Sequence, residues 1–157
     1  MIRIGLVSVF IVLLTSVSAQ TDLSYYLPSQ DYRSDIPVPG SIIGHEIGDW
    51  HLTHDKLTYY LQQLAEASDR IVYREYSMTW ENRPLFHLII TSPANHRKLE
   101  DIRLQHLALA DPAISDGLEI GKMPVVTRLG YGVHGHETSA STASVMVAYT
   151  LAPSNDK

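Results

Sequence analysis

Residues 124–151 read PVVTRLGYGVHGHETSASTASVMVAYTL, and this stretch sets the expected fold class. Pro124 to Tyr131 is apolar and rich in β-branched residues, which predicts a strand. Gly130 to Gly135 is a glycine-bearing turn, and Glu137 to Leu151 is expected to form a helix. The buried side of that helix is expected to hold Ala140, Ala143, Val147 and Leu151. The order strand, turn, helix indicates an α/β protein.

The preceding elements fit the same class. A helix is expected near His54 to Ala67, with Thr53 as its N-cap. Ile71 to Tyr76 and Leu85 to Thr91 are predicted strands, and the second is apolar enough to be central. Asn82 tolerates the left-handed conformation of a tight turn, so the two strands are expected to form a hairpin.

A further helix is expected to open at Ser92-Pro93, with Ser92 as cap. Leu99, Ile102, His106 and Leu109 would share one face of it. The helix should stop before Pro112, because a residue that precedes proline is disfavoured in the helical region. Residues 111–122 are then expected to form a surface loop.

The first 50 residues lack sustained periodicity. Residues 1–19 have the pattern of a signal peptide, with Arg3, an apolar run from Ile4 to Leu14 and a small-residue cleavage site. The run is shorter than the roughly 20 residues of a spanning helix, so no stable membrane insertion is expected. Residues 20–50 are expected to form an extended N-terminal arm. The protein is therefore expected to be secreted or periplasmic.

Composition narrows the function further. The chain has a net charge of -5 and no run of basic residues that could follow a phosphate backbone, so nucleic acid is not an expected partner. It contains 0 Cys, so a zinc site would have to use imidazole and carboxylate ligands.

His134 and Glu137 are candidate metal ligands, placed three residues apart just beyond a predicted strand end. Ligands in open α/β sheets bind in the crevice outside the carboxyl ends of the strands. Two His and one Glu, with an open position for water, are a recurring set for catalytic zinc. On spacing alone, however, His-x-x-Glu is more often a solvated turn.

The wider sequence resembles the zinc metallocarboxypeptidase family of carboxypeptidase A type, closest to its bacterial secreted branch. Besides the His134 to Glu137 motif, the resemblance is carried by Tyr25-Tyr26-Leu27-Pro28, Ile36-Pro37-Val38-Pro39, Leu64 to Arg70, Glu81-Asn82-Arg83-Pro84-Leu85 and Thr91-Ser92-Pro93-Ala94-Asn95-His96. It implies a mixed β-sheet with flanking helices, of which residues 51–157 would be the N-terminal part of the catalytic domain.

The resemblance also implies a site. His134 and Glu137 would bind Zn²⁺, and zinc-activated water would remove C-terminal residues from a peptide substrate. His136 would face the substrate at a position where the family usually has Asn or Arg, which leaves the residue preference open. The third ligand, a carboxylate clamp and a general base are expected beyond residue 157, so the 157 residues alone are expected to bind zinc poorly and hydrolyse nothing.

Two other functions stay open at this point. One is a zinc amide hydrolase that acts on a small acylated substrate. The other is a secreted binding module that keeps the fold without catalysis. His51 and His54 are also spaced like ligands, but they flank a predicted helix start and are better explained as its solvated residues.

Overall fold

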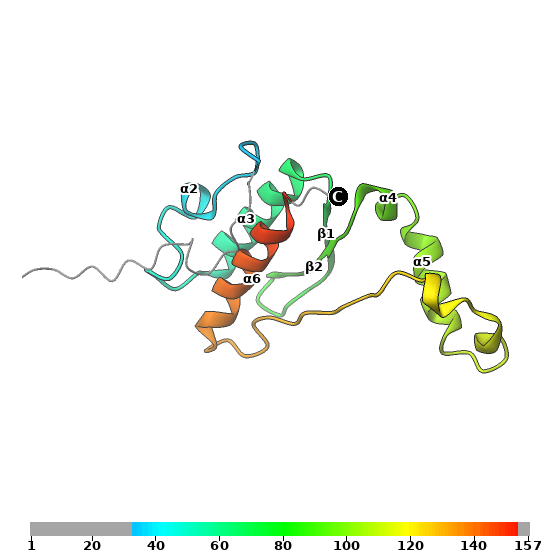
Figure 1. The fold of residues 1–157 in the computed structure, drawn as a ribbon. Coiled ribbons are helices and arrows are strands. Elements are labelled where there is room, and N and C mark those ends of the chain that lie inside the picture. Colours follow the sequence, from blue (N-terminus) through cyan, green and yellow to red (C-terminus); the bar gives the residue numbers. More distant parts are fainter. Residues whose placement is uncertain (1–32, 154–157) are drawn as a thin grey trace, which may run out of the picture.

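The structure is a computed structural model that describes residues 33–153 (Figure 1). The described chain contains both helices and a small β-sheet, so the protein belongs to the α/β class in the broad sense. Strands β1 (Ile71–Met78) and β2 (Pro84–Ile90) pair in an antiparallel sheet. Helix α3 (His54–Ala67) packs on β1, and α2 (Pro39–Ile43) and α6 (Thr138–Leu151) pack on α3.

The hydrophobic core lies around α3. Tyr60, Leu61 and Leu64 are buried on one side of this helix, at spacings that place them on a single face. They meet Val145 and Tyr149 of α6 in the main apolar cluster. The predicted bounds of this helix are confirmed, and Thr53 occupies the N-cap position without a side-chain cap hydrogen bond.

The predicted hairpin is confirmed. Its strands pair from Ile71 opposite Ile90 to Met78 opposite Pro84, with a bulge between Glu75 and Ser77. Asn82 has a φ of 60°, the left-handed conformation expected from its residue type. Because the described sheet has two strands, β2 is not a central strand.

The helix expected after Thr91 is divided in two. Ser92 accepts a hydrogen bond from the Asn95 N–H (3.2 Å) and caps α4 (Pro93–His96), as predicted. The backbone leaves helical geometry at Lys98, with φ -118° and ψ 15°, and α5 (Leu99–Ala108) begins after it. Helix α5 ends before Pro112 as expected; Leu99, Ile102 and His106 of its predicted face are half-buried, and none of its residues is fully buried.

One expectation about the N-terminal part of the chain needs correction. The segment expected as an extended arm contains α2, which ends at Gly44 with φ 85°, and it buries Ile36, Ile43 and Ile47 in the core. These apolar residues make the arm part of the packed domain. Residues 1–32, which include the predicted signal peptide, lie outside the described part of the chain.

The predicted buried face of α6 is wrong. The buried residues are Val145, Ala148 and Tyr149, followed by Ala152 after the helix, whereas Leu151 is 40% exposed. At 100° per residue, Val147 of the predicted set lies about 200° around the helix axis from the buried Val145, so the predicted set points away from the face that packs on α3.

The predicted third strand does not form within the described residues. Two 3-10 turns, η1 (Ser115–Gly117) and η2 (Ile120–Lys122), follow α5, and residues 124–131 then run back without regular structure (Figure 1). Among the described residues, β1 and β2 pair only with each other, so residues 124–131 have no strand partner. Residues 33–153 therefore contain a two-stranded antiparallel sheet in place of the expected mixed sheet.

None of the helices described between residues 33 and 153 is long and apolar enough to span a bilayer.

Candidate metal centre

His134 and Glu137 lie on the loop that enters α6. Gly132 has a φ of 64°, which turns the chain at a position where a side chain would be strained. The Glu137 N–H then donates to the His134 carbonyl (3.0 Å), which closes a turn, and Glu137 takes the N-cap position of α6. This turn brings the two side chains together across their spacing of three residues.

The two candidate ligands are in direct contact. His134 Nδ1–H donates to Glu137 Oε1 over 2.8 Å, because the carboxylate can only accept. The side chains are 62% and 45% exposed, so an ion could reach them from solvent. In a tetrahedral zinc site, an imidazole nitrogen and a carboxylate oxygen lie about 3.4 Å apart. A shift of about 0.6 Å would therefore open the hydrogen bond enough to admit Zn²⁺ between the two atoms.

The described residues bring no third ligand to this pair. No cluster of three or more His, Cys, Asp or Glu side chains suited to a metal ion occurs between residues 33 and 153. His134 and Glu137 fit as two ligands of a zinc site. They do not make a complete site by themselves.

His136 lies beside this pair. Its ring is stacked on that of His134, with the centroids 5.9 Å apart and the planes at 22°. Both His136 and Glu137 are exposed. His136 is therefore next to the candidate metal position and accessible to a ligand, and its expected contact with substrate remains a prediction.

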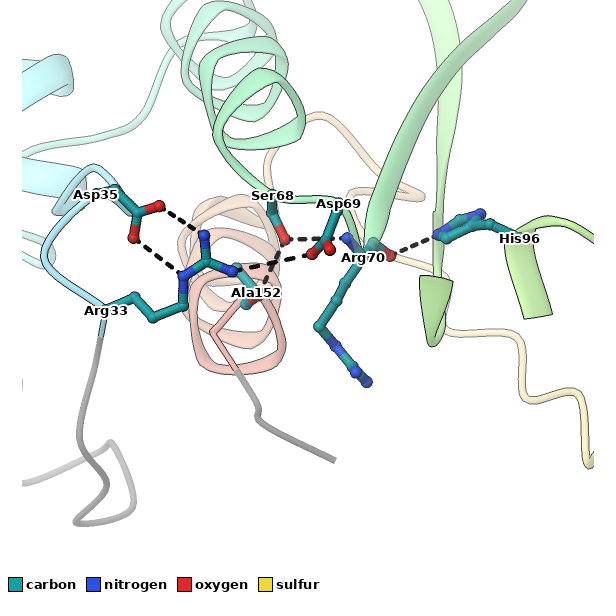
Figure 2. A network of polar contacts seen from close by, with 7 residues as sticks. All are labelled: Arg33, Asp35, Ser68, Asp69, Arg70, His96 and Ala152. Carbon is teal, nitrogen blue, oxygen red and sulfur yellow. Dashed lines mark hydrogen bonds and ion pairs between the residues drawn. The ribbon is translucent and has the colours of Figure 1, made fainter. Parts of the chain in front are cut away.

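A buried hydrogen bond sets the direction of α6 (Figure 2). Ser68 directly follows α3, and its hydroxyl donates to the carbonyl of Ala152, which directly follows α6 (2.9 Å). The two helices have 14 residues each and pack together, so they run in the same direction (Figure 1). Their first turns consequently lie at the same end of the molecule, with Glu137 near the start of α3.

Further polar contacts hold the opposite end (Figure 2). Ser68 Oγ also accepts from the Arg70 N–H (3.3 Å), and His96 Nε2 donates to the Arg70 carbonyl (2.8 Å). Arg33 pairs with Asp35 and lies 3.9 Å from Asp69. The hydrogen bond from Arg33 lowers the pKa of the Asp35 carboxyl.

Sequence reasoning did not find the role of Ser68 or of the Arg33 contacts. No sequence motif predicts these contacts. The partner of Ser68 is a backbone carbonyl 84 residues away, and the partner of Arg33 is a carboxylate 36 residues away. A polar residue immediately after a helix that packs tightly is the one local signal, and it is weak.

His54 and His106 have structural contacts. His54 Nε2 donates to the Pro84 carbonyl (3.1 Å) and so joins the start of α3 to the turn end of the hairpin. His106 Nε2 donates to the Pro124 carbonyl (2.8 Å). His51 is exposed, and the pair His51 and His54 forms no described metal cluster.

No protein-family model, no curated protein and no solved structure matches this chain.

Proposed function

We propose that His134 and Glu137 are two zinc ligands of a secreted zinc metallocarboxypeptidase with a carboxypeptidase-like fold, which removes C-terminal residues from peptides. The observation that carries the proposal is the 2.8 Å contact between His134 Nδ1 and Glu137 Oε1 at the start of α6. The same segment carries the sequence resemblance to that family.

Each residue has a defined task in this proposal. Glu137 is fixed by its place at the N-cap of α6, and the turn hydrogen bond from its N–H to the His134 carbonyl holds the imidazole against it. The adjacent His136 contributes to substrate binding. Bound zinc would supply a water molecule of lowered pKa and would polarise the scissile carbonyl.

The remaining parts of the site lie outside the described residues 33–153. Catalytic zinc takes three protein ligands, and residues 33–153 offer two that converge. The activity is therefore proposed for the full-length protein, with the third ligand, the carboxylate clamp and the general base supplied from outside residues 33–153.

The test is the release of C-terminal residues from a synthetic peptide by the full-length protein, followed by mass spectrometry. A chelator should abolish release, and added Zn²⁺ should restore it. His134→Ala and Glu137→Ala should each lower kcat/KM by roughly a thousandfold or more, because a metal contributes several kcal/mol of transition-state stabilisation.

His87→Ala is the matched control, because His87 is an exposed histidine on β2. It should leave the rate within about twofold, as expected of a surface change away from the site. Equal activity of the His134→Ala variant and the unchanged protein would contradict the proposal.

A non-catalytic binding module is the second candidate, favoured by the lack of a third converging ligand in the described residues. A folded full-length protein that contains no zinc and releases no residue would support it. A protein that binds zinc and hydrolyses a small acylated substrate but no peptide would support the amide hydrolase instead.

A further inference from the structure

A cavity of about 470 Å³ lies between the second half of α3 and strand β1, and we call it the edge groove. It is lined by Gln62, Ala65, Glu66, Ile71 and Tyr73. No residue of the described strand β2 lines it, so the cavity lies on the side of β1 that faces away from β2. Its volume is within the range of about 300–1,000 Å³ that is typical of ligand sites.

The backbone of β1 offers free hydrogen-bonding groups to the edge groove. The Thr91 N–H donates to the Arg70 carbonyl (3.0 Å), so Arg70 and Thr91 form a hydrogen-bonded pair. Bonded and non-bonded pairs alternate along an antiparallel ladder, so Tyr73 and Glu75 turn their N–H and C=O groups away from β2. Among the described residues, no hydrogen bond joins the backbone of Tyr73 or Glu75 to another element. Such an edge is a template for an added strand.

The mixed sheet of the proposed function leaves this edge open. Tyr60 packs with Tyr149 of α6 in the core, whereas Gln62 lies about 200° around the α3 axis from Tyr60. Helix α6 and the edge groove therefore flank α3 on opposite sides, and α6 lies on the side of β2. Residues 124–131 lead into α6, so a strand formed there would extend the sheet beyond β2.

The chemistry of the edge groove favours a basic side chain. Glu66 lines the groove, and Glu75 is held beside it by a hydrogen bond from the Tyr73 hydroxyl (3.3 Å). Both carboxylates are exposed, and neither forms an ion pair within residues 33–153. Ala65 and Ile71 add apolar wall. A side chain with an aliphatic stem and a cationic head, Lys or Arg, matches both parts.

The chain itself does not supply that side chain. The β1 residues that face α3 are Ile71, Tyr73 and Glu75, so β1 of a second copy would bring another carboxylate to the groove and no cation. Like charges that face each other across strands are unfavourable. Residues 20–32, which would precede the packed domain in the mature protein, contain no Lys or Arg. The expected occupant is therefore a different polypeptide.

We propose that the edge groove binds an extended peptide with a Lys or Arg side chain, which adds as a strand along β1 and places its cationic head between Glu66 and Glu75. This site goes beyond the proposed metal centre. Glu66 is about 18 Å along α3 from His54 at the start of the helix, the end at which Glu137 lies.

Fluorescence anisotropy of the full-length protein tests the charge preference, with labelled peptides TVKVT and TVEVT whose ends are blocked. The Lys peptide should bind at least about tenfold tighter than the Glu peptide. Glu66→Gln combined with Glu75→Gln should remove this difference. Equal binding of the two peptides, or binding of neither, would overturn the proposal.

Two control variants separate the edge groove from other sites. Glu81→Gln removes an exposed carboxylate at the turn of the same hairpin and should leave the affinity for the Lys peptide unchanged. His134→Ala should bind this peptide equally well, because the edge groove does not depend on the proposed metal site. A loss of binding in either variant as large as in the double Gln variant would contradict the assignment to the groove.

Amide hydrogen exchange, followed by NMR, locates the added strand. In the free protein, the Tyr73 and Glu75 amides should exchange readily, whereas the Val72 and Arg74 amides face β2 and should be protected. A saturating amount of the Lys peptide should slow exchange at Tyr73 and Glu75 at least about tenfold. Edge amides that are already protected in the free protein, or that are unchanged when the peptide binds, would overturn the proposal.

Discussion

Tyr60 shows at the scale of one residue how the core accommodates a polar atom. Its side chain has 0% exposure, and its hydroxyl donates to the Pro37 carbonyl over 3.2 Å. Burial, together with the nearby Tyr149, raises the pKa of Tyr60 above its ordinary value of 10.0. The hydroxyl therefore keeps its proton in the folded protein at pH values where an unfolded tyrosine ionises.

Tyr60→Phe should lower the free energy of unfolding by about 1 kcal/mol at pH 7, because the Pro37 carbonyl loses its donor. The pH dependence should change as well. A raised pKa contributes stability that is present below about pH 10 and is lost as pH rises further, since the unfolded state releases the proton first. The variant should lose less stability between pH 9 and 11, as measured by urea unfolding.

Tyr59→Phe is the neighbouring control, because Tyr59 is 55% exposed. An equal effect of the two substitutions would show that burial of the hydroxyl does not matter.

At the residue scale, the sequence predicted part of the chemistry. The spacing of His134 and Glu137 predicts that their side chains lie close together. The carbonyl that receives the Tyr60 hydroxyl could not be predicted, because it belongs to Pro37, 23 residues earlier in the chain.

At the scale of elements, local sequence signals predicted helix α3 and the hairpin correctly. Helix α3 follows from apolar periodicity, and the hairpin follows from β-branched runs around Asn82. Residues 124–131 have the same β-rich composition, but a strand exists only with a partner edge, and composition does not specify one. The buried face of α6 likewise depends on how the helix is rotated against α3.

The turn of the hairpin offers a direct test. Asn82→Ala should destabilise the fold by about 1 kcal/mol, because a side chain with a Cβ and no local polar group is disfavoured at a φ of 60°. Asn82→Gly should be close to neutral in the same thermal or urea measurement. Glu81→Ala, at an exposed neighbouring position, separates the backbone effect from simple truncation. An Ala variant as stable as the Gly variant would show that the turn tolerates another conformation.

The whole molecule has two unequal parts. Residues 33–90 and α6 share the core, whereas the stretch from Thr91 to Ala140 buries no residue. Its apolar side chains include Leu107 of α5 (56% exposed) and Ile120 of η2 (61%). Composition could not predict this division, because 45% hydrophobic residues is ordinary for a packed domain.

This division bears on the proposed metal site. The candidate ligands lie at the end of the unburied stretch, where it joins the packed α6. One side of the site is thus held by the core.

Coordination at one named nitrogen tests the central claim most directly. The full-length protein, with ¹⁵N-labelled histidines, would be titrated with Zn²⁺ and followed by NMR. We predict that the His134 Nδ1 resonance moves first to the position of a metal-bound nitrogen, and that Glu137→Gln weakens this response at least about tenfold. Zinc bound with the His134 Nδ1 resonance unchanged would contradict the account.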